Sequence, residues 1–334
     1  MSNSIKIFLI LILALPATSF GYEFSAMTLN VDNLFDTLDD IKKDDKAYLP
    51  IEFKQSEAHK KSCNRIRVNS WKDECLYLDW NEETKNAKLK NIANSIISYG
   101  QNGPDIIALQ EVENNNILSQ LLYLLKPYGY IDSVLIEGKD YRGIDTALIS
   151  RFKIIDSKLH YIKFSGEFEG KDTRPILDAT LEVNGDKLKI YNVHFPSGFH
   201  DVSMRIDSLD VLSRLLNSHN YPTIALGDFN VNTKEDRKLN IYKSQEIYWS
   251  VAHIYACDDC KGSFYYNYGK TWEFLDTIFL SKDRGISYVE DTIEIYRTKY
   301  NSYNDTGKPI NFNPAKKYGI SDHLPMVAKF EIFN

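Results

Sequence analysis

Apolar and polar residues follow two periodicities along the chain, which predicts alternating blocks of helices and strands. Apolar side chains recur at helical spacing in three segments, residues 85–99, 116–125 and 202–216. Short β-rich or apolar runs between these segments are typical of strands. The predicted strands are residues 24–31, 105–111, 146–150, 175–183, 187–194, 223–226, 274–280 and 326–332. This mixture favours an α/β sandwich with mixed sheets over a purely parallel doubly wound fold.

A turn signal joins two of these strands. Asn184-Gly185 separates the runs 175–183 and 187–194. Both residue types accept the positive φ angles that a tight hairpin turn requires, so the two runs are predicted to form an antiparallel hairpin.

The first 21 residues differ from the rest of the chain. Lys6 precedes an apolar run from Ile7 to Leu15, and small residues follow Pro16 as far as Gly21. This pattern is typical of a secretory signal peptide, with an uncleaved membrane anchor as the alternative. The apolar run is far shorter than the roughly 20 residues that a spanning helix needs. We therefore expect residues 22–334 to be secreted or periplasmic, without stable membrane association.

The four cysteines fall into two local pairs, Cys63/Cys75 and Cys257/Cys260. An even number in an exported protein indicates disulfides, and local pairing closes the smallest loops. A redox or zinc site at Cys257 and Cys260 is the alternative, although zinc would need two further ligands.

Residues 37–83 are polar and irregular in pattern, and they enclose the first cysteine pair. We interpret them as a long inserted loop or lid within a single domain. The overlapping span 41–90 is mildly basic, with twelve Lys/Arg against nine Asp/Glu, whereas the whole chain has a net charge of −6. Such a loop is suited to lie over an anionic substrate, or it is a solvated surface insertion pinned by a disulfide. The acidic total argues only weakly against nucleic-acid binding, because acidic metal ligands contribute to it.

Polar side chains stand at the ends of the predicted strands, where a rigid sheet positions functional loops. Carboxylate and amide oxygens are ligands suited to Mg²⁺, Mn²⁺ or Ca²⁺, and histidines move protons near neutral pH. A metal ion with two acid–imidazole pairs would supply most of what phosphate-ester hydrolysis needs. The strand-end residues are Asn30, Glu111, Asp145, His194, Asp228, Asn230, Asp276, Asp322 and His323.

Six sequence blocks resemble the endonuclease/exonuclease/phosphatase superfamily, the group related to pancreatic deoxyribonuclease. In the family's order they are TLNVDNLF (28–35), DIIALQEVE (105–113), RGIDTALIS (142–150), YNVHFPSG (191–198), LGDFNV (226–231) and SDHLPM (321–326). A single block could arise by chance, but the ordered set is specific. The resemblance implies a four-layered α/β/β/α sandwich with two mixed sheets and Mg²⁺-dependent hydrolysis of phosphoric esters.

The resemblance also implies roles for the strand-end residues. Glu111 resembles the principal metal-binding glutamate, with Asn30 and Asp322 near the same ion. His323 resembles the histidine that activates water or stabilises the transition state, oriented by Asp276. Asp228 and Asn230 resemble the pair that positions the nucleophile and the phosphate. His194 resembles a candidate general acid, and Asp145 resembles the acidic residue paired with it.

Two positions depart from the family pattern and affect phosphate binding. Trp272-Glu273-Phe274-Leu275 precedes Asp276 where many relatives carry a basic residue, and His194 lacks a basic stretch after it. Arg174 is a candidate substitute, because a guanidinium grips phosphate through two bonds. A surface ion-pair role is its alternative.

The blocks around Arg142 and Arg174 resemble secreted bacterial nucleases more than lipid phosphatases. The leading hypothesis is therefore a monomeric nuclease acting on extracellular DNA, with RNA as a further substrate. A phospholipid, phosphoinositide or sphingomyelin phosphodiesterase is the alternative, with Tyr265-Tyr266-Asn267-Tyr268 as the nearest membrane-facing candidate. A non-catalytic binding protein is a third, but every expected catalytic position is filled.

Overall fold

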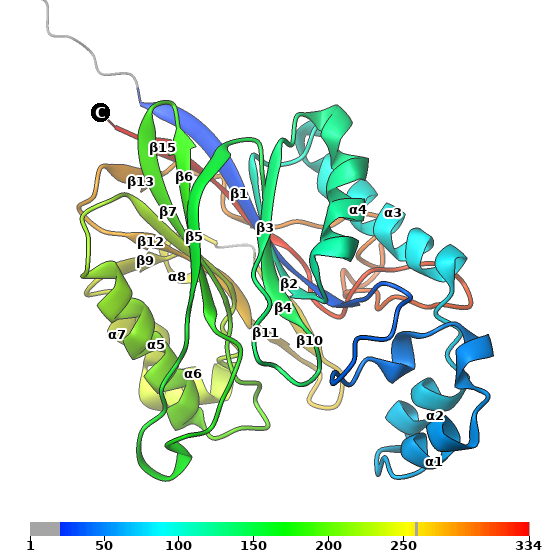
Figure 1. The fold of residues 1–334 in the computed structure, drawn as a ribbon. Coiled ribbons are helices and arrows are strands. Elements are labelled where there is room, and N and C mark those ends of the chain that lie inside the picture. The colour runs from blue at the N-terminus through cyan, green and yellow to red at the C-terminus, as the bar shows by residue number, and fades with distance from the viewer. Residues whose placement is uncertain (1–20, 258–259, 334) are drawn as a thin grey trace, which may run out of the picture.

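The computed structural model describes residues 21–257 and 260–333 and shows two β-sheets packed face to face (Figure 1). The first sheet contains, in order, β13 (Ile286–Tyr288), β15 (Met326–Ile332), β1 (Tyr22–Leu34), β2 (Ile106–Val112), β4 (Asp145–Ser150) and β3 (Asp132–Leu135). A further short strand, β14 (Glu294–Ile295), pairs with β15. The second sheet contains, in order, β5 (Lys153–His160), β6 (Ile176–Val183), β7 (Asp186–His194), β8 (Thr223–Asp228), β12 (Asp276–Ser281) and β9 (Trp249–Val251).

Helices cover the outer face of each sheet, so the predicted four-layered sandwich is confirmed (Figure 1). α3 (Glu82–Ser98) and α4 (Asn115–Leu125) pack on the first sheet. α5 (Val202–Leu216) and α7 (Ile241–Gln245) pack on the second, with α6 (Thr233–Leu239) between them in the chain. Outside residues 37–83, further short helical turns are α8 (Ala252–Tyr255), η3 (Tyr99–Gln101), η4 (Lys126–Tyr128) and η5 (Gly166–Phe168).

Side-chain alternation divides the core into three layers. In β1, Met27, Leu29 and Val31 face α3 and α4, whereas Phe24 and Ala26 face the second sheet. Both faces of the strand are therefore buried, which explains its nearly continuous apolar run. Asn30 continues the inward-facing set at the end of the strand, where it is 2% exposed. The alternation thus delivers a polar side chain between the sheets at one end of the sandwich.

Asparagines and aspartates cap the main helices by accepting hydrogen bonds from free backbone N–H groups. Asn81 caps α3 through Thr84 N, Asn114 caps α4, and Asp201 caps α5. These residues explain why the predicted helices begin close to where the apolar periodicity starts.

The expected hairpin is present: β6 pairs antiparallel with β7, and Asn184 and Gly185 at the turn have φ angles of 50° and 91°. Several strands were not predicted, namely β3, β5, β9, β10 (Phe264–Tyr266), β11 (Thr271–Glu273), β13 and β14. They are short or, like β5, expose one face, so their apolar pattern is weak.

The prediction of an irregular loop at 37–83 was wrong in its local structure. The segment contains η1 (Lys46–Tyr48), η2 (Ile51–Lys54), α1 (Glu57–Cys63) and α2 (Asn69–Tyr77). These helices are short, and α2 has little amphipathic pattern. A disulfide and buried polar contacts hold them together in place of an apolar face, so the sequence pattern did not reveal them. We call residues 46–79 the insertion lobe.

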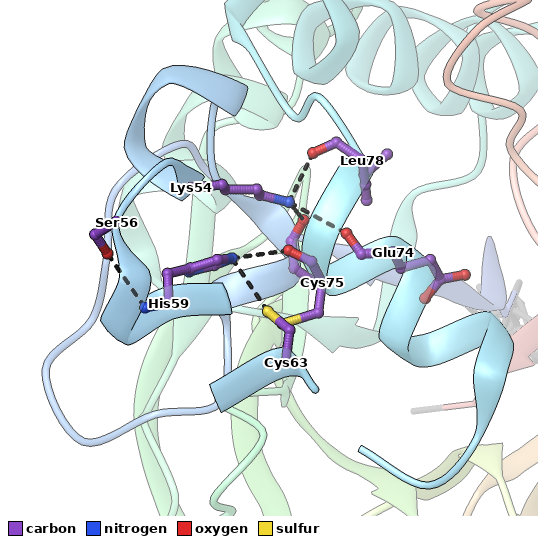
Figure 2. The surroundings of a disulfide bond; sticks show 8 residues. Lys54, Ser56, His59, Cys63, Glu74, Cys75 and Leu78 are labelled. Carbon is purple, nitrogen blue, oxygen red and sulfur yellow. Dashed lines mark hydrogen bonds between the residues drawn. A yellow bond between two sulfur atoms is a disulfide. The ribbon is translucent and has the colours of Figure 1, made fainter. Parts of the chain in front are cut away.

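Figure 2 shows how the insertion lobe is fastened. Cys63 and Cys75 form a disulfide, and Nε2 of His59 lies 2.8 Å from the carbonyl oxygen of Cys75. The buried Nζ of Lys54 donates to the carbonyl oxygens of Ala47, Glu74 and Leu78. One lysine thus satisfies backbone carbonyls from both sides of the lobe.

The second predicted pair, Cys257 and Cys260, also lies at disulfide distance, with a Cα–Cα separation of 5.2 Å. Apart from Gly21, the predicted signal peptide at 1–21 lies outside the described residues. Within the described ranges, no helix combines the length and apolar character that crossing a bilayer requires.

Candidate active site

Strand ends from both sheets meet at one end of the sandwich. β1 runs parallel to β2, and β7 runs parallel to β8, so the carboxyl ends of each pair lie together. Asn30 Nδ2 donates to Asp228 Oδ2 at 3.2 Å, joining the first sheet to the second. The structure therefore brings together residues that are almost 200 positions apart in the sequence.

Asp276 and His323 form a buried acid–imidazole dyad. Oδ2 of Asp276 lies 2.6 Å from Nδ1 of His323. Asp276 begins β12, and its backbone N–H donates to Ser263 Oγ, while the N–H of His323 donates to Ser321 Oγ. Both backbones are fixed, so the imidazole orientation is set before any ligand arrives.

Asp228 lies beside this dyad: atoms of Asp228, Asp276 and His323 all lie within 4.8 Å of one another. Asp228 Oδ1 accepts from Asn230 N at 2.9 Å, and Asn230 Nδ2 donates to the carbonyl oxygen of Phe195. The preceding Gly227 has φ 145°, and a Cβ there would come within 2.0 Å of Val193 O. Only glycine allows β8 to approach β7 closely enough to place Asp228.

Glu111 lies near the end of β2, beside a turn at Asp32 and Asn33 that a buried lysine supports. Its Oε2 accepts from Asn33 N at 3.1 Å. Lys88 of α3 donates from Nζ to the carbonyl oxygens of Asp32 and Asn33. Lys88 is 2% exposed, and its ammonium lies over the rings of Trp80 and Phe312. This lysine therefore holds the segment that orients Glu111.

His194 reaches the same centre from β7. Its Nε2 lies 3.5 Å from Asp228 Oδ2 and 3.8 Å from Glu111 Oε1. The predicted partner Asp145 instead accepts from Gly138 N at 2.8 Å. Oδ2 of Asp145 and Nδ1 of His194 are both buried without a hydrogen-bond partner. The pairing of these two residues stays a prediction.

Arg174 and Arg142 have different surroundings in the structure. Arg174 is 9% exposed and donates to the carbonyl oxygens of His194 and Phe195 and to Asp140 Oδ2. It holds the His194 backbone, and its predicted contact with phosphate has no support in this arrangement. Arg142 has a half-exposed side chain whose Nη2 lies 2.8 Å from Asn33 Oδ1 and 3.8 Å from Glu111 Oε2. Arg142 is therefore the accessible guanidinium beside Glu111.

Burial and mutual repulsion shift the acidic groups of this centre. Burial and the neighbouring Asp276 raise the pKa of Asp228 to about 7. Desolvation by the surrounding protein and the nearby Asp32 raise the pKa of Asp322 to about 7, with a further contribution from Glu111, although 40% of its side chain stays exposed. Hard oxygen donors crowded in this way fit a divalent ion.

The two histidines differ in charge preference. Burial opposes the charged form of His323, but Asp276 and Asp322 outweigh it and raise the pKa of this histidine well above its ordinary value. Burial, with Arg174 and Arg142 nearby, lowers the pKa of His194 well below its ordinary value. The centre thus holds one imidazole that favours the cation and one that favours the neutral ring.

Several residues at this end of the sandwich have left-handed backbone conformations. Glu111 has φ 65°, Asn230 has φ 54°, and Asp32 and Asn33 have φ 50° and 64°. Asparagine and aspartate tolerate this region, whereas glutamate rarely adopts it. The pairing of β1 with β2 is irregular here, between Asn30 and Leu34. The irregularity turns the Glu111 side chain toward the site and not into the helix layer.

A buried polar network supports the site from below. Gln110 Nε2 donates to Asn192 Oδ1 at 2.7 Å, and Asn192 Nδ2 donates to the carbonyl oxygens of Leu109 and Ala147. Sequence reasoning missed Gln110 and Asn192, although both lie inside quoted blocks at inward-facing positions. It also missed Lys88, whose only signal was a lysine on the apolar side of a predicted helix.

Comparisons with known proteins agree with this geometry. A model of the endonuclease/exonuclease/phosphatase family matches residues 75–331. No curated protein sequence gives a significant match.

Solved structures share the fold at low sequence identity. A family protein from Bacteroides vulgatus has a TM-score of 0.58 at 16% identity, with 93% of this chain and 99% of that chain covered. One from Leptotrichia buccalis has a TM-score of 0.56 at 19% identity, with 92% and 100% covered. D. rerio TDP2 complexed with a single strand DNA product has a TM-score of 0.55 at 17% identity, with 92% and 98% covered.

The matched family model spans most of the chain and includes nearly every residue of the site just described. Metal-dependent phosphoesterases and nucleases make up this family. The chain belongs to the endonuclease/exonuclease/phosphatase family.

Proposed function

We propose that the protein is an exported, Mg²⁺-dependent phosphodiesterase that hydrolyses extracellular nucleic acid, with DNA as its main substrate. The observation that carries the proposal is the Asp276–His323 dyad, which lies beside Asp228 and the acidic set around Glu111. A buried imidazole next to clustered hard ligands is the arrangement that metal-assisted hydrolysis of a phosphodiester requires.

Glu111, Asn30 and Asp322 are the residues that would hold the ion, which would neutralise charge on a phosphoryl oxygen. The Asp322 side chain is 40% exposed, so this position is open to a ligand from solvent. The Arg142 guanidinium adds positive charge beside Glu111 and would contact a phosphate oxygen.

The remaining residues would handle protons and the attacking water. Because Asp276 occupies Nδ1 of His323, its Nε2 is the nitrogen that faces the substrate. Asp228 and Asn230 are held rigidly by backbone contacts and would position water and phosphate. His194 is the candidate general acid in this scheme, with Asp145 as its partner; because its ring favours the neutral form, it would donate an N–H hydrogen bond to the leaving oxygen.

Export is supported by the predicted signal peptide and by two cysteine pairs at disulfide distance, which suggest a location outside the cytoplasm. Nucleic acid as substrate is supported by the fold shared with TDP2, which was solved with a DNA product. A monomer is expected.

A phospholipid phosphodiesterase is the second candidate, and one observation favours it. Tyr266 and Tyr268 at the β10–β11 hairpin are 48% and 91% exposed, and exposed tyrosines are suited to a membrane interface. The hairpin strands are β10 (Phe264–Tyr266) and β11 (Thr271–Glu273).

The test compares substrates directly. Purified residues 22–334 are incubated with plasmid DNA, RNA and sphingomyelin or phosphoinositide vesicles, each with Mg²⁺ and with a chelator. We expect Mg²⁺-dependent DNA degradation. Hydrolysis of lipid without degradation of nucleic acid would contradict the nuclease proposal and support the lipid alternative.

Metal binding is tested separately from turnover. Mg²⁺ should raise the melting temperature of the wild type, because a ligand that binds only the folded state stabilises it by about 2.7 kcal/mol at one hundred times its Kd. Glu111→Gln should abolish this shift, whereas Glu182→Gln, at an exposed position of β6, should keep it. An equal shift in both variants would remove Glu111 from the metal site.

A further inference from the structure

An aromatic groove opens directly beside the metal end of the active site. Its volume is about 430 Å³, and Asp322, a proposed metal ligand, forms part of its wall. One wall is β10 with the turn that joins it to β11, and the other is a loop near residue 308. The groove is lined by Phe264, Tyr265, Tyr266, Tyr268, Tyr303 and Lys308, among others.

The hairpin wall is attached to the catalytic dyad itself. The ring of Phe264 lies 5.1 Å from the ring of His323, centroid to centroid, and the two residues form a backbone bridge. Leu324 N donates to the carbonyl oxygen of Ser263, and Asp276 N donates to the Ser263 hydroxyl. The position of this wall relative to His323 is therefore fixed.

The opposite wall brings a cation against the aromatic rings. Lys308 Nζ lies 3.7 Å from the ring centroid of Tyr265, and Tyr303 N donates to the carbonyl oxygen of Lys308. Arg297 lies over the ring of Trp272 on the hairpin. Two cations thus accompany the rings in a protein whose net charge is −6. This combination suits a flat aromatic ligand attached to an anionic chain.

We propose that this groove binds an unpaired nucleobase of the nucleotide next to the scissile phosphate. The proposal rests on the nuclease function proposed above and names its substrate class: single-stranded nucleic acid or a frayed end. A base within a duplex is already stacked and paired, so it cannot enter the groove without being flipped out. Because every base has a π-face, the groove would select unpaired bases with little sequence preference.

The exposed position of the tyrosines makes the proposal testable by substitution. Tyr268 is 91% exposed and Tyr303 is 51% exposed, so replacing both with alanine removes stacking surface and little core packing. Tyr123→Ala on α4 is the matched control, because Tyr123 is 73% exposed and lies outside the groove.

The experiment first maps where the wild type cuts a labelled single-stranded oligonucleotide. The same oligonucleotide is then made with an abasic tetrahydrofuran residue on either side of that position, and as a duplex. We expect KM for the intact single strand to rise on the order of tenfold in Tyr268→Ala/Tyr303→Ala. The abasic oligonucleotide should raise KM similarly for the wild type, and the double variant should add little to that loss.

The outcomes separate the two proposals. If the wild type cuts single strands but treats intact and abasic oligonucleotides alike, or if the double variant matches Tyr123→Ala, the base-binding groove is wrong and the nuclease function stands. Faster cutting of duplex than of single strand would also overturn the groove proposal. If no oligonucleotide is cut while sphingomyelin vesicles are hydrolysed, both proposals fail.

Discussion

The carboxylate of Asp276 accepts a 2.6 Å hydrogen bond from the imidazole of His323, and both side chains are buried between the sheets. The bond selects the nitrogen of His323 that is left to face a substrate. It joins the first residue of β12 to the loop before β15, so the catalytic geometry depends on the two sheets staying together.

Asp276→Asn should therefore lose turnover while keeping its fold. The amide can still occupy the position, but it cannot stabilise an imidazolium, and general acid–base contributions are worth about 10²-fold or more. Rates on a chromogenic phosphodiester and circular dichroism spectra measure the two properties. The exposed Asp156→Asn on β5 is the control. A variant at Asp276 with near wild-type kcat would refute the dyad.

Lys88 is expected to support the site without touching substrate. Lys88→Met should leave the carbonyl oxygens of Asp32 and Asn33 without this donor, lowering the free energy of unfolding by about 1–3 kcal/mol. Because that turn orients Glu111, the Mg²⁺ concentration for half-maximal activity should also rise. Lys90→Met, on the same helix but exposed, should change neither. Destabilisation with unchanged Mg²⁺ dependence would limit Lys88 to a structural role.

Substitutions of the two arginines should affect different properties, substrate binding for Arg142 and stability for Arg174. Arg142→Ala should raise KM roughly tenfold at unchanged melting temperature, since the side chain is half exposed and charge-assisted contacts contribute about 1.5–3 kcal/mol. Arg174→Ala should lower the melting temperature, because it leaves the carbonyl oxygens of His194 and Phe195 unsatisfied. The reverse pattern would restore Arg174 as the phosphate ligand.

His253 should make stability depend on pH. Burial lowers its pKa from 6.5 to about 3. As pH falls, the unfolded chain takes up a proton on His253 before the folded chain does. The contribution of the neutral ring to the free energy of unfolding is therefore full above pH 6.5 and is lost toward pH 3. The loss approaches about 1.4 kcal/mol per pH unit. His253→Gln should flatten this dependence in urea unfolding measured between about pH 7 and pH 4. Parallel curves for both proteins would contradict the buried neutral ring.

Sequence periodicity predicted the central strands and the three long helices, because each buries a continuous apolar face. It failed for the insertion lobe, where Lys54 and a disulfide replace apolar packing. It also failed for β5, which has only one partly buried face.

The site was predictable where catalytic residues end strands, as with Asp228 and His194. It was not predictable where a side chain's role depends on what surrounds it. Arg174 and Arg142 look equivalent in the sequence, yet one is enclosed by backbone carbonyls and the other faces solvent. Lys88 is a further case, since its place on the apolar side of a predicted helix does not show which carbonyl oxygens its ammonium contacts.

The left-handed conformation of Glu111 creates a trade-off between turnover and thermal stability in this protein. A glutamate at φ 65° costs of order 1 kcal/mol that a glycine would not. Random mutants selected only for heat resistance should therefore accumulate Glu111→Gly and other inactive replacements at this position. Improving the enzyme by directed evolution would require scoring survival and turnover in the same round, because heat resistance alone favours loss of the site.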